Sequence, residues 1–278
     1  MRIFNFGLAD RRMRKDQALK PVERNSLWDQ AYAELRQALL AGRFAPGDRI
    51  VLRDIATELE ISLTPVRDAV NRLIAERILE RGSSGQGGGA MVPALTKIQF
   101  DELVIIRCDL EGRAASRAAA LASKESVATL QSLLKRMKAL IREKRPQDYL
   151  DLHRQFHFAI YAEARMPLLL EMIENVWLRC GPGLNYFVSR HTLGSKLASN
   201  TTGRSMASSI SAKAVDHHAL AVDAIARRDC EGAASAIMEN ISEAGRYIAD
   251  LADEKGIIRP PPGSNSLQST ETARVPTA

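Results

Sequence analysis

Cysteine, aromatic residues and long hydrophobic runs are scarce in this sequence, and each scarcity excludes a class of protein. The three cysteines, Cys108, Cys180 and Cys230, are scattered and form no CxxC motif, which argues against a disulfide framework and a cysteine-type zinc site. No stretch approaches the roughly 18 consecutive apolar residues of a membrane-spanning helix. No apolar segment follows the basic run at 11–15, so we expect no signal peptide and a soluble, cytoplasmic protein.

Aromatic residues make up 5% of the 278 residues, whereas hydrophobic residues as a whole make up 45%. Alanine and leucine dominate the hydrophobic set, which favours packed helices over sheets, where β-branched and aromatic residues are enriched. The length is typical of two domains of ordinary size. We therefore expect a mainly α-helical protein with two domains.

The net charge of +6 permits an anionic partner, but the charge is distributed unevenly. Residues 1–24 hold seven basic and three acidic residues, and we expect them to form a disordered basic arm. Residues 25–95 hold eight arginines against nine acidic residues. Any contact of this second segment with nucleic acid would therefore depend on individual side chains and not on overall charge.

Residues 25–95 have the pattern of a winged helix-turn-helix. Apolar residues at helical spacing predict three helices, and two short apolar runs that flank a glycine-rich hairpin predict two strands. The helices are expected over 26–41, 52–59 and 62–76, and the strands over 78–80 and 90–92. In such a motif the helix after the turn presents its first residues to base edges in the major groove of DNA.

The start of the third expected helix carries the candidate DNA-binding residues. Its apolar positions, Val66, Ala69, Val70 and Leu73, define a buried face. Leu63, Thr64 and Arg67 then point outward after the capping residue Ser62, and Arg53 opens the preceding helix. Arginine can hold a guanine edge with two hydrogen bonds, and serine or threonine can reach bases or phosphates. Three-helix units with surface arginine and threonine also occur in proteins that do not bind DNA.

An ordered motif runs through residues 27–93, namely Gly42, then Pro46-Gly47-Asp48-Arg49-Ile50, then Ile61 to Val70 and Leu73. In this motif the segment resembles the GntR family of transcriptional regulators. The resemblance implies that Arg53, Ser62, Thr64 and Arg67 contact DNA and that a glycine of the wing enters the minor groove. Leu63 stands where the family usually has a second arginine. The wing is longer and richer in glycine than usual, with Gly87, Gly88 and Gly89 as candidates, of which we choose Gly88.

The C-terminal part has a helical pattern, and we expect a bundle of six to seven helices over 96–252. Thr96 and Gln99 have the spacing of a capping box at its start. We expect a break at Gly181-Pro182-Gly183, a mobile loop over 190–212 and a disordered tail over 253–278. The expected helices cover 96–121, 124–144, 147–164, 167–180, 212–227 and 229–252.

Histidines provide a second candidate site. His153 and His157 lie four residues apart, so both emerge from one face of a helix, a spacing that can hold a metal ion. His218, at the start of a later helix, and Asn240, in the last helix, are further candidates. The alternative is that these histidines are ordinary polar positions, with His217-His218 a solvated helix start.

Four short motifs follow one another in residues 97–252, namely Arg107 to Glu111, Phe156-His157, Trp177-Leu178-Arg179, and His218 with Ala224-Ile225. In these motifs the segment resembles the FCD domain, the ligand-binding half of the FadR-type branch of the GntR family. Many members of this branch bind a divalent metal through an aspartate and three histidines. His153 stands at the aspartate position and Asn240 at that of the third histidine. The resemblance therefore leaves open a three-histidine site for zinc or nickel at His153, His157 and His218, and a metal-free polar pocket.

The resemblance also implies that Arg107 faces this cavity and binds the carboxylate of an effector. The alternative is that Arg107 pairs with Asp109 or Glu111 on its own helix. We include Asn240 and the three histidines, together with Arg107, among the residues expected to bind the effector.

We expect a homodimeric regulator, a repressor and not an enzyme, that reads an inverted repeat in double-stranded DNA. A small organic acid would control it by shifting the two DNA-binding domains through the linker at 90–96. Two rival interpretations remain: a helical metal-dependent enzyme built on His153, His157 and His218, and a helical adaptor that binds proteins.

Overall fold

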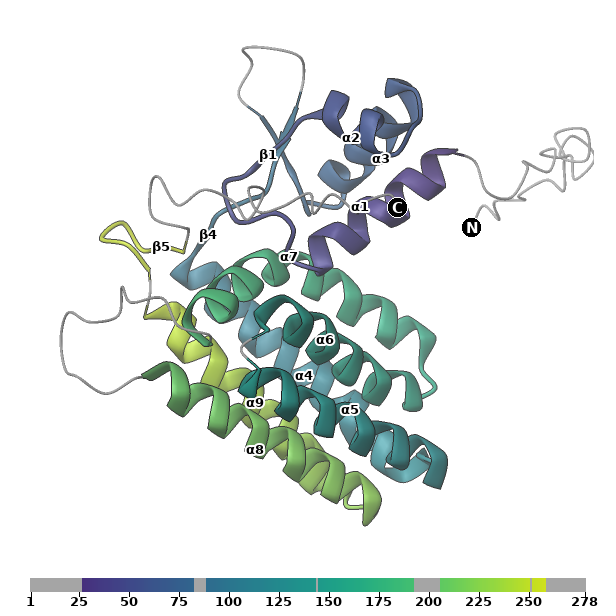
Figure 1. The fold of residues 1–278 in the computed structure, drawn as a ribbon, viewed down its shortest axis with the longest axis vertical. Helices are drawn as coiled ribbons and strands as arrows, with labels where there is room; N and C mark the ends of the chain where they lie inside the picture. Colours follow the sequence, from purple (N-terminus) through teal and green to yellow (C-terminus); the bar gives the residue numbers. More distant parts are fainter. Residues whose placement is uncertain (1–26, 83–88, 144, 193–205, 251, 259–278) are drawn as a thin grey trace, which may run out of the picture.

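A computed structural model describes residues 27–82, 89–143, 145–192, 206–250 and 252–258, with the backbone alone at 146–147, 183–192 and 206–215. A small head of three helices and a sheet lies on a larger bundle of helices (Figure 1). The expected fold class, a winged helix-turn-helix followed by an all-helical domain, is confirmed. Among the described residues, no helix is both long and apolar enough to cross a membrane.

The head follows the expected order of elements, with one additional strand. Its elements are α1 (Leu27–Leu40), β1 (Arg49–Ile50), α2 (Leu52–Glu58), α3 (Leu63–Ala75), β2 (Glu80–Arg81) and β3 (Ala90–Met91). The three antiparallel strands have the order β1-β3-β2, with Arg49 opposite Met91 and Glu80 also opposite Met91. The sequence did not predict β1. Ile78 and Leu79, which we expected in a strand, are buried core residues that precede β2.

The turn between α1 and β1 explains part of the family motif in structural terms. Gly42 and Gly47 have positive φ angles of 72° and 89°, a backbone region that only glycine adopts readily. The carboxylate of Asp48 accepts a hydrogen bond of 2.8 Å from the backbone N–H of Ala45. This motif therefore shapes the turn that brings β1 beside the wing strand β3.

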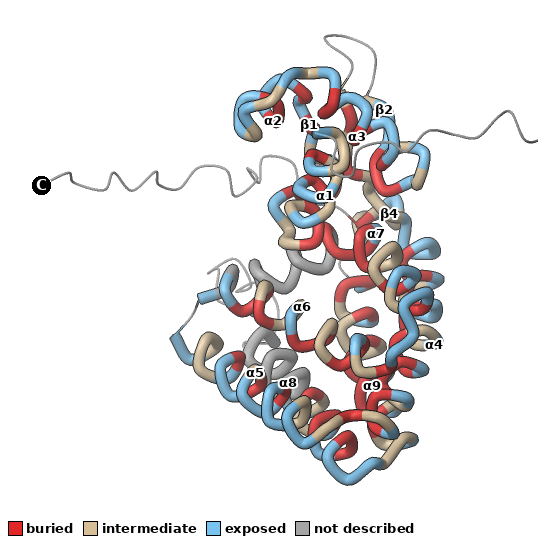
Figure 2. The backbone as a smooth tube through the Cα atoms, turned by 90° about the vertical axis from the view of Figure 1, so that its right-hand side faces the viewer, coloured by how far each residue is buried: buried red, intermediate tan, exposed pale blue. Residues whose placement is uncertain are grey.

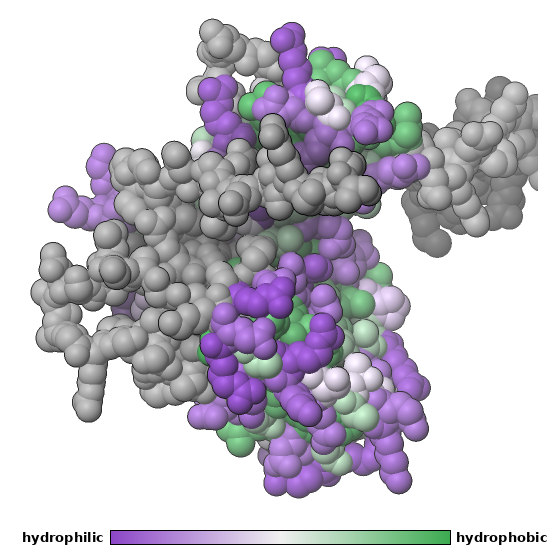
Figure 3. Space-filling view, viewed as in Figure 1, coloured by the Kyte–Doolittle hydropathy of each residue, from purple (hydrophilic) through white to green (hydrophobic). Residues whose placement is uncertain are grey.

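The helical domain is built around α4. Its elements are α4 (Lys97–Leu121), α5 (Lys124–Arg142), α6 (Pro146–Glu163), α7 (Pro167–Thr192), α8 (Met206–Ala226) and α9 (Cys230–Ala249). Helix α4 packs against α6, α7, α8 and α9, and buried residues line the facing sides of the helices (Figure 2). The capping box is present, because the Thr96 side chain accepts from the Gln99 backbone and the Gln99 side chain accepts from the Thr96 backbone. On the face shown in Figure 3, hydrophilic residues predominate at the described surface, with hydrophobic ones between them.

Two expectations about helix limits in this domain are wrong. Helix α7 continues through Gly181-Pro182-Gly183 to Thr192, although proline removes one hydrogen bond from a helix interior. Leu178 and Cys180 are buried beside the proline, so packing against neighbouring helices outweighs the local preference. Helix α8 begins at Met206, so residues 190–192 and 206–212 of the expected loop are helical, and 193–205 lie outside the described residues.

The expected tail is also wrong at its start. Residues 252–258 are ordered, and Ile257–Ile258 form the strand β5. This strand pairs antiparallel with β4 (Leu95–Thr96), with Leu95 opposite Ile258. The end of the helical domain therefore contacts the linker that leaves the head, and only 259–278 of the expected tail lie outside the described residues.

The head and the helical domain are joined by polar contacts between α1, α3 and α7, and α1 packs directly against α7 (Figures 1 and 2). Arg36 of α1 donates hydrogen bonds to Glu174 at 3.1 Å and to Asn175 at 3.2 Å, both on α7. Arg179, also on α7, donates at 3.0 Å to the backbone carbonyl of Glu76, the residue that ends α3. Helix α7 therefore holds two helices of the head.

Candidate DNA-reading edge and histidine cluster

The first turn of α3 presents an exposed polar edge on a buried apolar base. Val66, Ala69 and Leu73 are fully buried, whereas Thr64 and Arg67 are exposed. Ser62 occupies the N-cap position, yet its side chain makes no capping hydrogen bond. The hydroxyl of Ser62, the side chain of Thr64 and the first N–H groups of the helix therefore share one end of α3, an arrangement suited to bind phosphate or bases.

The other sequence-predicted residues of the head lie in three different environments. Arg53 is exposed at the start of α2. Leu63 is half-buried and packs against the hydrophobic core, so it is less available to a partner than its neighbour Thr64. Gly88 lies outside the described residues. Its neighbour Gly89 is described, and a Cβ atom there would come within 3.0 Å of the carbonyl oxygen of Ile50, so glycine is needed for close packing in the sheet.

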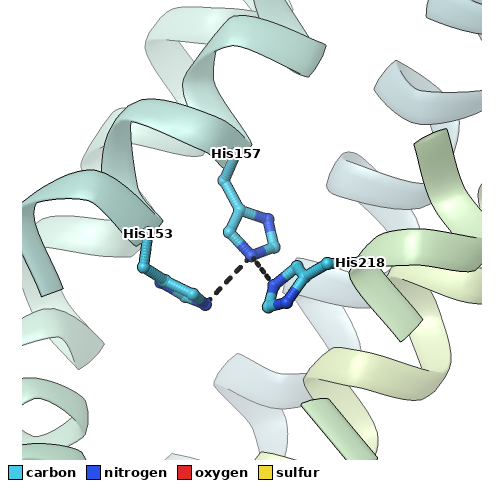
Figure 4. Close-up of side chains that lie close together, drawn as sticks. All are labelled: His153, His157 and His218. Carbon is cyan, nitrogen blue, oxygen red and sulfur yellow. Dashed lines mark hydrogen bonds between the residues drawn. The ribbon is translucent and has the colours of Figure 1, made fainter. Parts of the chain in front are cut away.

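His153, His157 and His218 form a compact cluster in the helical domain (Figure 4). His153 and His157 come from α6, and His218 comes from α8, where it lies inside the helix and not at its start as the sequence suggested. The Nε2 atom of His157 lies 3.1 Å from Nε2 of His153 and 3.0 Å from Nε2 of His218. His157 and His218 are completely buried, so the interpretation of His218 as a solvated position is wrong.

A chain of buried hydrogen bonds connects this cluster to Arg107. The Arg107 side chain donates to Glu111 at 2.7 Å, the hydroxyl of Tyr161 donates to the same carboxylate, and Nδ1 of His157 lies 2.8 Å from that hydroxyl. Because the Tyr161 hydroxyl donates its hydrogen to Glu111, its oxygen can only accept a hydrogen bond from the N–H at Nδ1 of His157. Neutral His157 then carries its N–H on Nδ1, and its Nε2 lone pair faces the two other histidines.

Burial controls the charges in this cluster. It lowers the pKa of His153 to about 3, with a further contribution from the positive charge of Arg107. The pKa values of His157 and His218 are also lowered, first by burial and then by neighbouring charges, so all three imidazoles are neutral at pH 7. Burial alone would lower the pKa of Arg107, but the carboxylate of Glu111 outweighs it and the pKa is raised.

The three histidines fit a transition metal better than the sequence alone indicated. Nitrogens bound at about 2.0–2.1 Å to a tetrahedral zinc ion lie about 3.3–3.4 Å apart, close to the two Nε2 separations observed. Neutral imidazoles are the ligand form that zinc and nickel require. Asn240 is buried on α9, but none of the hydrogen bonds that the three histidines make within the described chain goes to it.

Three residues of this site were missed as functional candidates, namely Glu111, Tyr161 and Trp177. Glu111 and Tyr161 follow Arg107 and His157 by four residues, the spacing that places side chains on one helix face. The Trp177 ring lies 4.9 Å from the guanidinium carbon of Arg107, and its indole N–H is buried with no hydrogen-bond partner among the described residues. No local signal in the sequence indicated the contact of Trp177, because it depends on how α7 packs on α4.

Comparisons with known proteins cover both halves of the chain. Residues 27–92 match the gntR family of bacterial regulatory proteins, and residues 102–243 match the FCD domain. The HTH-type transcriptional regulator McbR of Escherichia coli (strain K12) is 35% identical over 161 residues, which are 58% of this chain and 72% of that protein. The gluconate operon transcriptional repressor of Bacillus licheniformis is 23% identical over 235 residues, 84% of this chain and 89% of that protein.

The solved structure of E. coli McbR/YncC has the same architecture. It superposes with a TM-score of 0.65 at 29% sequence identity and covers 79% of this chain and 95% of that chain. A transcriptional regulator structure from Rhodococcus sp. RHA1 superposes with a TM-score of 0.59 at 21% identity, covering 80% of this chain and 97% of that chain, and supports the fold alone.

Proposed function

Because the chain belongs to the GntR family of bacterial regulatory proteins and carries an FCD domain, it is a transcriptional regulator, and we propose that it is a homodimeric repressor controlled by a small organic acid. The relatives are regulators and not enzymes, so the rival interpretation as a metal-dependent enzyme is not supported. In the proposed mechanism, two α3 helices of a cytoplasmic dimer read the two halves of an inverted repeat.

The exposed edge of α3 is the observation that carries this proposal. Thr64 and Arg67 are exposed and point away from the buried face of the same helix, and the helical domain does not cover them. If the edge of α3 served only to pack the head against the helical domain, Thr64 and Arg67 would be buried. The edge also combines a cationic fork, hydroxyl groups and a helix N-terminus, which suits the donors and acceptors of the major groove.

The environment of Arg107 supports an organic acid as effector. Its guanidinium group is buried and already binds the carboxylate of Glu111, so a ligand carboxylate would replace a group of the same chemistry. The indole N–H of Trp177, which has no partner among the described residues, offers an additional donor beside the guanidinium. Leaving such a buried donor unpaired costs about 1–3 kcal/mol, which a bound carboxylate oxygen would recover.

His153, His157 and His218 would hold a divalent metal, zinc or nickel, which would supply a positive charge for the effector carboxylate. The hydrogen bond from His157 to Tyr161 fixes the imidazole with its Nε2 lone pair toward the other two histidines. His153 stands where many members of this branch have an aspartate. Three neutral imidazoles would not neutralise any of the positive charge of the metal, whereas an aspartate would neutralise part of it. Such a site attracts a carboxylate more strongly than a site that contains an aspartate.

The proposal is tested first by gel shift of the purified full chain against the intergenic DNA beside its own gene. We expect a retarded complex at low salt that survives an excess of unrelated duplex. A protein that ignores duplex DNA at low salt would leave the adaptor interpretation in place. The addition of the responding acid should release the complex, whereas tighter binding would make the protein a corepressor-dependent regulator.

The metal is tested by elemental analysis of the purified protein and of two histidine variants. We expect about one zinc or nickel ion per chain, lost in His157→Ala. His217→Ala is the matched control, because the adjacent His217 pairs with Glu239 and Glu243 on α9 and lies outside the cluster. Equal metal content in all three proteins would place the metal elsewhere.

The effector is tested by a thermal-shift screen of organic acids. For an acid that stabilises the protein, Trp177→Phe keeps the ring but removes the N–H, and we expect affinity to fall roughly 5- to 15-fold, as for one lost hydrogen bond. Unchanged affinity in this variant would exclude the indole from the site.

A further inference from the structure

The end of the helical domain folds back onto the linker that connects it to the head. We call residues Asp253–Ile258 the C-terminal clasp. Its strand β5 pairs antiparallel with β4, with Leu95 opposite Ile258 and Thr96 opposite Ile257. In addition, the backbone N–H of Lys97 donates at 2.7 Å to the carbonyl of Gly256. The clasp therefore pairs with Leu95 and Thr96 of the linker and with Lys97, the first residue of α4.

The clasp has its own internal structure. The carboxylate of Asp253 accepts hydrogen bonds of 2.9 Å from the backbone N–H groups of Lys255 and Ile257. Gly256 has a φ angle of 69°, and its N–H donates to the carbonyl of Asp253 at 2.7 Å. An aspartate at the start of a turn and a glycine at its end are the residues that this geometry favours. The segment is therefore built as a turn and not as an extension of α9.

Ile258 anchors the clasp between the two domains. It is 2% exposed and belongs to a small hydrophobic cluster separate from the main core. The cluster takes residues from the head, from α4, from α7 and from α9, namely Ala45, Phe100, Leu103, Cys180, Ile248 and Ala249. Through Ile258 the clasp joins a hydrophobic cluster to which the head and three helices of the helical domain also contribute.

The other end of the linker is held by the head. The N–H of Val92 donates to the carbonyl of Asp48 at 2.9 Å, and the carbonyl of Val92 accepts from the N–H of Gly47 at 2.9 Å. Between this attachment and the clasp lie only Pro93 and Ala94. Proline fixes its own φ angle, so the unattached part of the linker is short and one of its backbone rotations is removed.

We propose that the C-terminal clasp confines the hinge between head and helical domain to Pro93-Ala94, and thereby sets which half-site spacing the dimer accepts. This inference rests on the proposed function as a DNA-binding dimer. Each inserted base pair moves a half-site by about 3.4 Å and rotates it by about 34–36°, so heads on short linkers tolerate few spacings. Without the clasp, the linker would be free up to the start of α4, and only the contacts of the head with α7 would limit the positions that each head reaches.

The proposal is tested by comparing the full chain with a chain that ends at Ala252 and with a control chain that ends at Ile258. The DNA set holds the operator and versions with one or two base pairs inserted between the half-sites. For the full chain and the control we expect roughly tenfold weaker binding to the two-pair insertion, and for the chain without the clasp less than about threefold. Equal spacing dependence in all three proteins would overturn the proposal.

A point variant covers the case in which truncation prevents folding. Asp253→Ala removes the acceptor of the two turn hydrogen bonds, and Glu254→Ala, exposed in the same turn, is its matched control. We expect Asp253→Ala to reduce the spacing dependence and Glu254→Ala to leave it unchanged.

Hydrogen exchange separates the failure of this proposal from the failure of the proposed function. The amide of Lys97 donates to the clasp, so its exchange should be at least about tenfold faster in the chain that ends at Ala252, whether or not the protein binds DNA. Full chains that bind no DNA would contradict the proposed function, and the exchange rate would still test the clasp. Unchanged exchange at Lys97 would overturn the clasp even if DNA binding is found.

Discussion

The head and the helical domain hold their candidate residues in opposite ways. In the head, Thr64 and Arg67 extend from a helix whose other face is packed, and they are exposed. In the helical domain, Arg107, His157 and His218 are buried, and one series of hydrogen bonds through Glu111 and Tyr161 connects all three. The head can therefore bind a partner without breaking a contact within the protein. The helical site has to exchange an internal contact for a ligand.

This difference separates two kinds of mutational effect. If the edge of α3 binds DNA as proposed, substitutions there remove contacts made only with DNA, so they should change affinity and leave folding stability intact. Substitutions in the buried series of hydrogen bonds from Arg107 to His157 leave a polar side chain without its hydrogen-bond partner. They should therefore lower the free energy of unfolding even without a ligand.

Glu111→Ala should cause the largest loss of stability. It leaves the buried guanidinium of Arg107 without its carboxylate and removes the acceptor of the Tyr161 hydroxyl. Breaking a buried ion pair by removing one partner costs about 3–5 kcal/mol, which urea denaturation would measure. Asp109→Ala on the same helix is exposed and serves as the control, with a change within about 0.5 kcal/mol. Similar losses in both variants would contradict the buried pair.

Arg36→Ala should weaken the attachment of the head to α7. The Arg36 side chain is 16% exposed and donates to Glu174, to Asn175 and to the hydroxyl of Tyr32. Hydrogen bonds of charged groups contribute about 1.5–3 kcal/mol, so we expect the head to unfold at a lower temperature than the helical domain. Calorimetry would then show two unfolding transitions whose temperatures lie further apart than those of the wild-type protein.

The control for this variant is Glu34→Ala, since Glu34 is exposed on the same helix. If the two variants give the same calorimetric trace, the polar contacts of Arg36 do not hold the domains together.

Arg67→Ala should weaken operator binding by about 1–3 kcal/mol and relax the preference at one base pair, without changing the melting temperature. Its exposed side chain contributes nothing to the core that Val66 and Leu73 form. Titrations against operators substituted at each position would locate that base pair. Arg142→Ala, exposed on α5, changes the net charge equally and should retain affinity and specificity. Equal weakening on every sequence would show that Arg67 contacts phosphate alone.

Local patterns were sufficient to predict most of the head. The apolar spacing of Val66, Ala69 and Leu73 fixes which side of α3 is buried, and Ser62 marks where the helix begins. The same local rule could have chosen between Asp109 and Glu111 as partner of Arg107, because side chains two residues apart do not share a helix face.

Contacts between distant segments could not be predicted in this way. His218 meets His157 only because α8 lies near α6, so no local pattern shows this contact, and only the resemblance to the FCD domain led us to group the two residues. The break expected at Pro182 follows a local rule that packing overrides. The pairing of β4 with β5 joins two strands of two residues each, too short for a periodic pattern and far apart in the chain. The hydrogen bonds that connect the site and the contact of the linker with β5 therefore required the structure.

The basic arm gives the smallest and most uniform of the expected effects. Residues 1–20 hold six basic and two acidic residues and lie outside the described part of the chain. If they bind phosphates, each contact contributes about 0.9 to the slope of log affinity against log salt. Removing residues 1–20 should therefore flatten this slope, weaken binding to every duplex alike, and leave the preference read by Arg67 unchanged. Binding measured between 50 and 200 mM salt, about the range over which such contacts act, would show it. An unchanged slope would mean that the edge of α3 and its surroundings supply all the ionic contacts of the head.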